Sequence, residues 1–188
     1  LNKKLTKDIY KFNFGPNIKF SRICLINNRE YIGKYVGVLH EVFVILKNNC
    51  TVETIKGNYY VDWTRHLGDR SKNPDKYKKD GKILELAFND ENTDLSLKHR
   101  YAYYCGQSYR DSNLYQKSIN WFNKYLELPN NDNNQYKYCA CISLGMNYKD
   151  IKNTEQSLYF FGLAYNYDST RIEGITYIMQ YFYDKKLH

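Results

Sequence analysis

The stretch YAYYCGQSYRDSNLYQKSINWFNKY (residues 101–125) aligns without a gap with ACISLGMNYKDIKNTEQSLYFFGLA (residues 140–164). The match rests on Gly106, Tyr109, Ser118 and Phe122, which recur 39 residues later as Gly145, Tyr148, Ser157 and Phe161. A fixed period of this size is typical of helical repeats. A small residue and an aromatic residue three or four positions apart share one face of a helix. The pattern therefore predicts pairs of antiparallel helices that approach closely at the small residues.

The helical pattern extends on both sides of the matched stretches. We expect helices at about 95–110, 114–127, 134–149, 154–167 and 170–184, after an earlier helical segment at 77–88. Polar turns at 111–113 and 150–153 are short, whereas the break at 128–132 contains Pro129, which stops a helix. The last helix either begins a third repeat or caps the stack.

The N-terminal part favours strands. Alternating or β-branched apolar residues predict strands at about 18–26, 42–46, 51–55 and 59–63, and Gly57 with its neighbours predicts a hairpin between the last two. The expected fold class is α+β, mainly α. The expected divisions are a strand-rich segment (1–66), a basic loop with a linking helix (67–94) and a helical repeat domain (95–188).

Composition narrows the function classes. The chain has 188 residues, 43% of them hydrophobic, a net charge of +8 and five cysteines. Its mean hydropathy is −0.73, and no long uncharged apolar run predicts a membrane span. The bases are mixed with acids, and Lys, Asn, Tyr and Ile are abundant together, as in AT-rich coding sequences, so we expect no nucleic-acid partner. Cysteines without a C-x-x-C pair favour a reducing, cytoplasmic setting.

The helical part resembles the tetratricopeptide family over about residues 95–184. Gly106, Tyr109, Ser118 and Phe122 stand at that family's small and aromatic positions, and the second copy adds Leu144 and Ala164. The chain departs from the family in having Cys141 where the second unit's early Trp is expected. The polar insertion after Leu128 lengthens the period beyond the family's roughly 34 residues.

A second resemblance covers the N-terminal part and the connection. In order along the chain come Ser21-Arg22, Gly37, His40-Glu41, the 51–63 strands, His66, Arg70, Lys72 and the stretch Tyr103-Tyr104-x-x-Gln107-Ser108-Tyr109. This order resembles the end of a family 2 glycosyltransferase catalytic domain of the GT-A type with appended tetratricopeptide repeats. Leu1 in place of an initiating Met suggests that the sequence is a piece of a longer protein.

The resemblance implies roles for particular residues. Glu41 would be the catalytic base, His66 a ligand of the divalent metal (Mn or Mg), and Arg70 and Lys72 contacts to the phosphates of a nucleotide sugar. His40 and Tyr104 would contact substrate. The repeats would position a protein or peptide acceptor in a groove between residues 101–109 and 136–148. No D-x-D and no glycine-rich loop occurs, so we expect no tightly bound cofactor and no turnover by this fragment alone.

Other interpretations stay open. His40-Glu41 suits a polar step at a sheet edge, Trp63 and Leu67 could bury His66, and the basic loop could be merely solvated. The Tyr101–Tyr109 stripe is typical of core packing. As a whole, the chain could instead be an adaptor whose repeats bind a peptide. RNA binding by a basic, Tyr-rich surface is a third interpretation, although composition bias explains most of this basic, Tyr-rich character.

Overall fold

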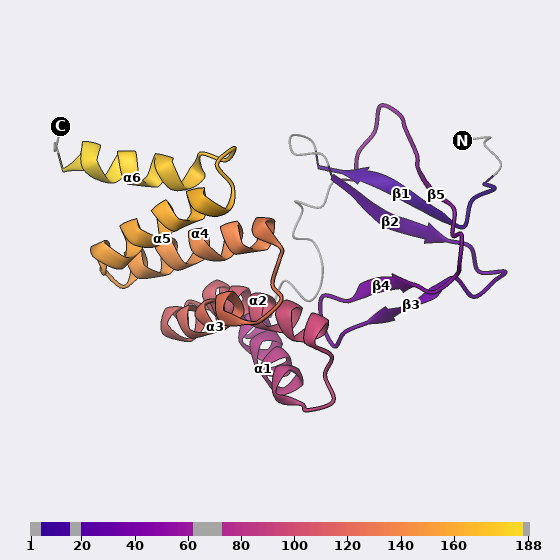
Figure 1. Ribbon diagram of the computed structural model, residues 1–188, viewed down its shortest axis with the longest axis horizontal. Helices are drawn as coiled ribbons and strands as arrows, with labels where there is room; N and C mark the ends of the chain where they lie inside the picture. The colour runs from indigo at the N-terminus through magenta and orange to yellow at the C-terminus, as the bar shows by residue number, and fades with distance from the viewer. Residues whose placement is uncertain (1–4, 16–19, 62–72, 186–188) are drawn as a thin grey trace. The chain divides into compact units, whose positions relative to one another are not determined.

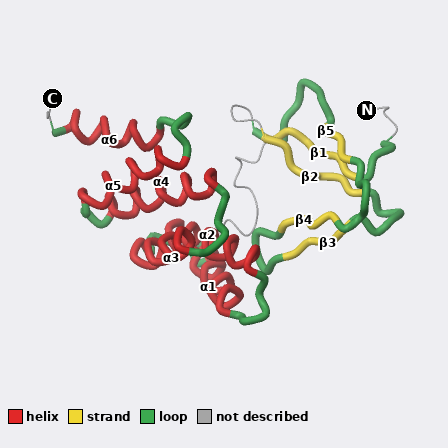
Figure 2. Tube along the Cα trace, viewed as in Figure 1, coloured by secondary structure: helices red, strands yellow, loops and turns green. Residues whose placement is uncertain are grey.

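The computed structural model describes residues 5–15, 20–61 and 73–185. The chain divides into two compact units, Leu1–Asn73 and Pro74–His188. Strands form the described part of the first unit, and helices form the second (Figures 1 and 2). The expected fold class, α+β and mainly α, is confirmed.

A three-stranded sheet is built around β1 (Ile9–Phe14), which the sequence reasoning did not predict. β1 lies between β2 (Phe20–Ile26), antiparallel to it, and β5 (Val52–Thr54), parallel to it. Ile9 and Tyr10 are buried, and the register with β2 shifts between Tyr10 and Lys11.

The predicted hairpin at 56–58 is wrong. The segment after β5 leaves the sheet and returns to the same strand, where Val61 forms a parallel bridge with Phe14. The Val61 amide donates to the carbonyl of Asn13, just as the Ile55 amide donates to the carbonyl of Lys11. Both predicted strands therefore pair with β1 and not with each other, because β1 offers an edge that the local turn signal did not reveal.

A separate two-stranded hairpin holds the His40-Glu41 pair. β3 (Gly33–Val36) pairs antiparallel with β4 (Val42–Ile45) in the register Gly33–Ile45 to Val36–Val42. The connection between the strands spans residues 37–41, with Gly37 at φ 112° and His40 at φ 53°. His40 and Glu41 thus lie in an exposed turn and not within a strand.

The second unit is a series of helices joined by short connections. They are α1 (Lys76–Asn89), α2 (Leu95–Asp111), α3 (Tyr115–Glu127), α4 (Asn134–Asp150), α5 (Thr154–Tyr167) and α6 (Glu173–Asp184). Each begins and ends within three residues of its predicted bounds. The side chains of Asp94, Asn133 and Asn153 accept hydrogen bonds from amides in the first turns of α2, α4 and α5 and fix where these helices start.

The repeat predicted from the 39-residue period has matching contacts in both copies. A methyl group at Gly106 would lie 2.9 Å from the Phe122 ring, and one at Gly145 would lie 2.5 Å from the Phe161 ring. The Ser118 hydroxyl donates to the carbonyl of Gly106 at 2.7 Å, and the Ser157 hydroxyl donates to that of Gly145 at 2.8 Å. In each helical hairpin, therefore, a phenylalanine ring and a serine hydroxyl of the second helix both contact the glycine of the first helix.

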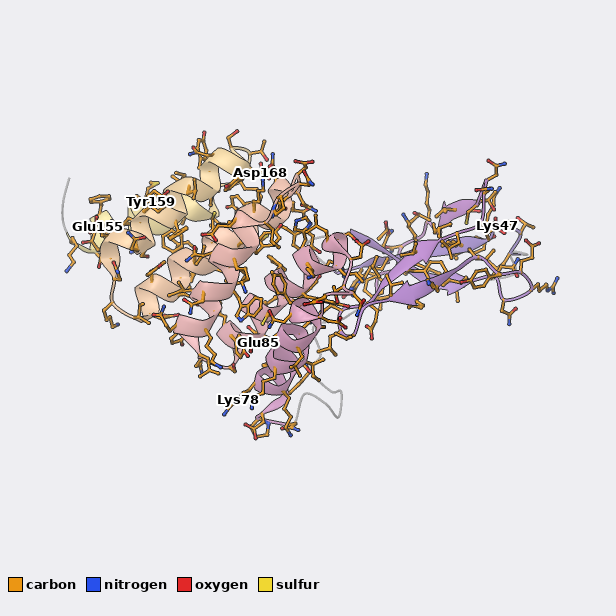
Figure 3. The ribbon with its side chains drawn as sticks, turned by 60° about the horizontal axis from the view of Figure 1, so that its bottom comes forward. Lys47, Lys78, Glu85, Glu155, Tyr159 and Asp168 are labelled. Carbon is orange, nitrogen blue, oxygen red and sulfur yellow. The ribbon has the colours of Figure 1, made fainter. Side chains whose placement is uncertain are left out.

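α1 belongs to the helical unit, although we expected it in a linking segment at 67–94. Leu84 is fully buried, and a methyl group at Gly81 would lie 3.0 Å from the Tyr109 ring of α2. The Tyr109 hydroxyl donates to Glu85, labelled in Figure 3, at 2.6 Å. Gly81 precedes Ser118 by 37 residues, close to the repeat period. α1 thus takes the position before α2 that α3 takes before α4.

Successive hairpins are joined by a buried polar chain. The Asn147 amide of α4 donates to the Ser118 hydroxyl of α3 at 2.8 Å, and its oxygen accepts from Arg110 of α2. The same guanidinium lies 3.4 Å from the Asp150 carboxylate. Asn147 and Ser118 are fully buried, so these bonds satisfy groups that would be costly to leave unpaired.

Candidate functional site

The described site residues predicted in the strand unit do not form a cluster for metal chemistry. His40 and Glu41 are exposed in the β3–β4 turn, and His40 holds a left-handed backbone that is uncommon outside glycine. His66, Arg70 and Lys72 lie outside the described residues. Within residues 5–15, 20–61 and 73–185, no three His, Cys, Asp or Glu side chains lie close enough to hold a metal ion.

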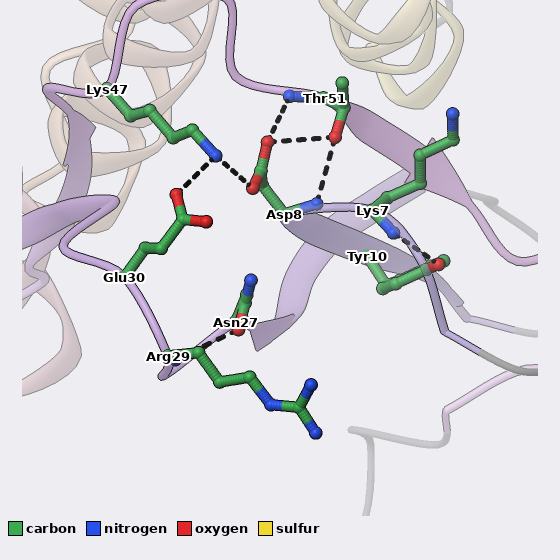
Figure 4. Close-up of polar contacts among 8 residues, drawn as sticks. All are labelled: Lys7, Asp8, Tyr10, Asn27, Arg29, Glu30, Lys47 and Thr51. Atoms are coloured by element: carbon green, nitrogen blue, oxygen red, sulfur yellow. Dashed lines mark hydrogen bonds and ion pairs between the residues drawn. The ribbon is translucent and has the colours of Figure 1, made fainter.

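A polar cluster around Asp8 joins separate segments of the strand unit (Figure 4). The Asp8 carboxylate accepts from the Thr51 amide at 2.8 Å, from the Thr51 hydroxyl at 2.9 Å and from Lys47 at 2.6 Å. Lys47 also pairs with Glu30 at 2.8 Å. The Lys47 and Thr51 bonds lower the pKa of Asp8 to about 2. Asp8 therefore remains an ionised clamp and is unsuited to act as a base near neutral pH.

Tyr104, predicted to contact substrate, lines a pocket in the helical unit, which we call the Tyr104 pocket. Its volume is about 220 Å³. Its lining comes from the first half of α2, the end of α3, the α3–α4 loop and the start of α4: Ser96, His99, Arg100, Tyr103, Tyr104, Tyr125, Asn130, Asn131, Asp132, Asn133 and Tyr136. From the segments of the expected acceptor groove, 101–109 and 136–148, Tyr103, Tyr104 and Tyr136 line this pocket.

Aromatic rings make one side of this pocket rigid. Tyr103 packs edge-on against Tyr136, Tyr104, Tyr125 and Phe122, with ring centroids 4.6–5.7 Å apart. The Tyr104 and Tyr136 hydroxyls lie 3.2 Å apart. Perpendicular packing places the positive ring edge against the negative ring face, which restricts each ring's orientation. Tyr101 and Tyr109 are buried, so the predicted tyrosine stripe is divided between core and pocket.

The loop on the opposite side is held in place by hydrogen bonds. Asn131 is buried, donates to the Tyr125 carbonyl at 2.9 Å and lies 3.2 Å from the Tyr125 hydroxyl. His99 of α2 bonds the Pro129 carbonyl through Nε2 at 2.8 Å. Asn133 caps α4 by accepting from the Tyr136 amide. The polar insertion seen in the sequence is therefore an ordered wall of the pocket.

The side chains that line the Tyr104 pocket carry almost no net charge. Arg100 is its cation, with the guanidinium 5.3 Å from the Tyr104 ring centroid, and Asp132 is its acid. Burial raises the pKa of Tyr103, and burial raises that of Tyr125 to about 12. These hydroxyls stay protonated at physiological pH. The lining consequently offers uncharged hydroxyls and amides that both donate and accept.

Sequence reasoning found Tyr104 but not the residues that surround it. Tyr136 was part of the expected groove, whereas His99, Arg100 and Asn131 were not singled out. A usable signal was present, because the Asn-rich insertion follows Pro129 and its end directly precedes the second repeat. An insertion at the start of a repeat helix lies beside the start of the previous one, and so beside residues 96–104.

Comparison with known proteins gives one distant likeness to report. The chain is 24% identical over 140 residues to the 43 kDa receptor-associated protein of the synapse from Gallus gallus, a match that covers 73% of this chain and 34% of that protein. The chain thus spans about a third of the relative's length. No family model matches the chain, and no solved structure gives a significant match. Among the described helices, none is both long and apolar enough to cross a bilayer.

Proposed function

We propose that this chain is the C-terminal part of a sugar-nucleotide-dependent glycosyltransferase whose helical unit positions a protein or peptide acceptor. The observation that carries the proposal is the order of residues along the chain: Gly37, His40-Glu41, His66, a basic segment and then helical repeats. The β3–β4 turn presents Glu41 to solvent, where a general base can meet an acceptor hydroxyl.

The strained turn supports a functional role for this pair. A non-glycine residue with positive φ is costly and persists where the surrounding structure enforces it, often at functional sites. In this turn His40 has φ 53°, and Gly37 has φ 112°. His40 is the non-glycine residue of positive φ in this connection and directly precedes Glu41.

Burial in the strand unit also supports the proposal. Its described residues bury Ile9, Tyr10, Ile32 and Ile55, whereas many large apolar side chains are exposed, among them Tyr31, Tyr35, Val38, Val42, Ile45, Leu46, Val52 and Tyr60. Exposed apolar side chains on a small unit can be covered by further protein. This pattern is expected of strands that complete a larger catalytic domain.

The test is a substitution in a protein that carries this chain together with its donor-binding half. Glu41→Gln keeps the side chain's size but removes the base, so kcat for sugar transfer should fall by roughly 100-fold or more while the donor Kd stays within about twofold. Glu91→Gln, an exposed position in the α1–α2 connection, is the matched control. Unchanged transfer by Glu41→Gln removes Glu41 from the mechanism.

A second candidate function is a peptide-binding adaptor without catalysis. The observation in its favour is the likeness to a protein named for its association with a receptor, together with an aromatic pocket on the repeat helices. An adaptor predicts that residues 74–188 bind a partner as tightly as the whole chain does. A partner affinity that falls when residues 1–73 are removed would count against it.

A further inference from the structure

We propose that the Tyr104 pocket binds one pyranose ring, so that the acceptor presented by the helical unit carries a sugar. The inference rests on the proposed function only in assigning that sugar to the acceptor. Binding of a sugar by the pocket is a separate property, measurable without any transfer reaction.

Size is the first argument. A volume of about 220 Å³ is below the roughly 300–1,000 Å³ of sites that enclose a drug-sized ligand. The pocket therefore suits a single ring. A pyranose ring and an aromatic side chain are two ring-sized groups that a protein acceptor can offer.

The lining distinguishes between these two ligands. An aromatic side chain would use only the tyrosine rings of this lining, whereas a pyranose can also bond the hydroxyl and amide groups of Ser96, Asn130 and Asn133. Each vicinal hydroxyl of a pyranose both donates and accepts, which matches tyrosine hydroxyls and asparagine amides. The C–H groups of the sugar carry a slight positive charge and suit the negative face of a tyrosine ring.

Charge and order complete the argument. One cation, Arg100, and one acid, Asp132, leave no net charge to select an anionic ligand. The Asn131–Tyr125 and His99–Pro129 bonds hold the loop before any ligand arrives. A pre-formed wall lowers the entropy lost on binding, which matters for a ligand as small as one ring.

The experiment titrates the 188-residue chain, with its tyrosine rings isotopically labelled, with methyl pyranosides of glucose, galactose, mannose and N-acetylglucosamine. The expected result is a saturable shift of the Tyr104 and Tyr136 ring signals by at least one of them. N-acetyl-tyrosine amide and inorganic phosphate are the competing probes. No shift with any pyranoside, or a shift of these rings only with a competing probe, overturns the inference.

Two substitutions test the contacts. Tyr104→Phe and Arg100→Gln should each weaken pyranoside binding about tenfold, since a hydrogen bond to a neutral or charged group contributes on that order. Tyr159→Phe is the matched control, because Tyr159 is exposed on α5 (Figure 3) and does not line the pocket. The helical circular dichroism signal confirms that each variant folds. Equal weakening by Tyr159→Phe would also overturn the inference.

The two proposals fail separately. Pyranoside binding together with unchanged transfer by Glu41→Gln would reject the glycosyltransferase and keep the sugar pocket. Transfer that depends on Glu41, without pyranoside binding at the Tyr104 pocket, would reject the sugar pocket alone.

Discussion

Two glycines decide how closely the helices of each hairpin approach. Gly106 and Gly145 each face a phenylalanine ring at a distance that leaves no room for a methyl group. The sequence predicted close approach of the helices at both glycines, because a small residue and an aromatic residue recur together at one period. The close approach of two helices can therefore be predicted from sequence where a repeat contains the same small and aromatic residues twice.

Gly145→Ala should destabilise the helical unit by about 1–3 kcal/mol, because its methyl group would overlap the Phe161 ring. Gly162→Ala is the matched control in α5. No atom outside the helix lies within 4 Å of a methyl group there, so better helix propensity should stabilise by up to about 1 kcal/mol. Denaturant unfolding followed by helical circular dichroism measures both. Equal effects of the two substitutions would contradict the packing described.

The two equivalent serines should respond differently. Ser157→Ala removes one bond to the Gly145 carbonyl and should cost about 0.5–1.5 kcal/mol. Ser118→Ala also leaves the buried Asn147 amide without its acceptor, and an unsatisfied group adds about 1–3 kcal/mol. Unfolding of the two variants under identical conditions gives the difference. A Ser157→Ala cost at least as large as that of Ser118→Ala would argue against the polar chain between hairpins.

At the scale of elements, helices were predictable and strand pairing was not. Helix bounds follow from local signals such as Asp94, Asn133 and Asn153, each of which bonds an amide within three residues. Strand partners are set by distant residues: β1 pairs with β5 more than 40 residues later. A Gly-Asn turn signal at 57–58 suggested a local hairpin, and the long-range pairing with β1 prevailed.

The Asp8 clamp should make the strand unit sensitive to acid. Its pKa is about 2 in the folded chain against an ordinary 3.8. A lowered pKa means that the carboxylate stabilises the fold fully above about pH 4 and that this contribution is lost as the pH falls toward 2. Hydrogen exchange of the Thr51 amide, which donates to Asp8, reports the change.

Asp8→Asn supplies the control for this prediction. The variant should exchange the Thr51 amide faster near neutral pH, because the ion pair with Lys47 is gone. Its protection should then change less between pH 4 and 2 than that of the unsubstituted chain. The same acid response with and without the carboxylate would show that Asp8 is not the titrating group.

At the scale of the whole molecule, the two units differ in how much of their apolar surface they bury. The helical unit has its own core, including Tyr109, Phe122, Tyr138, Leu144 and Phe161. We expect residues 74–188 to fold alone and to unfold cooperatively, with a Tm within about 5 °C of the same transition in the full chain. Thermal circular dichroism at the helical band measures this. A fragment that is unfolded at 25 °C would contradict the division after Asn73.

The site was less predictable than the fold, for a physical reason. Tyr104 was named through the resemblance of the 103–109 stretch to a repeat helix of glycosyltransferases. The pocket around it depends on a loop whose position is fixed by Asn131 and His99. Such bonds join residues 6 and 30 positions apart and leave no periodic trace. The proposed role of Glu41 comes from the order of residues along the chain, since His66, Arg70 and Lys72 lie outside the described residues.

The most direct measurement of the central claim is transfer of a labelled sugar from nucleotide sugars, with Mn²⁺ or Mg²⁺, by a protein that carries this chain and its donor-binding half. We expect transfer to the acceptor by that protein. After removal of residues 74–188, we expect loss of acceptor transfer with the donor Kd within about twofold, because the helical unit holds the acceptor. Absence of transfer and of donor hydrolysis with every nucleotide sugar, alongside intact partner binding by residues 74–188, would contradict the glycosyltransferase and favour the adaptor.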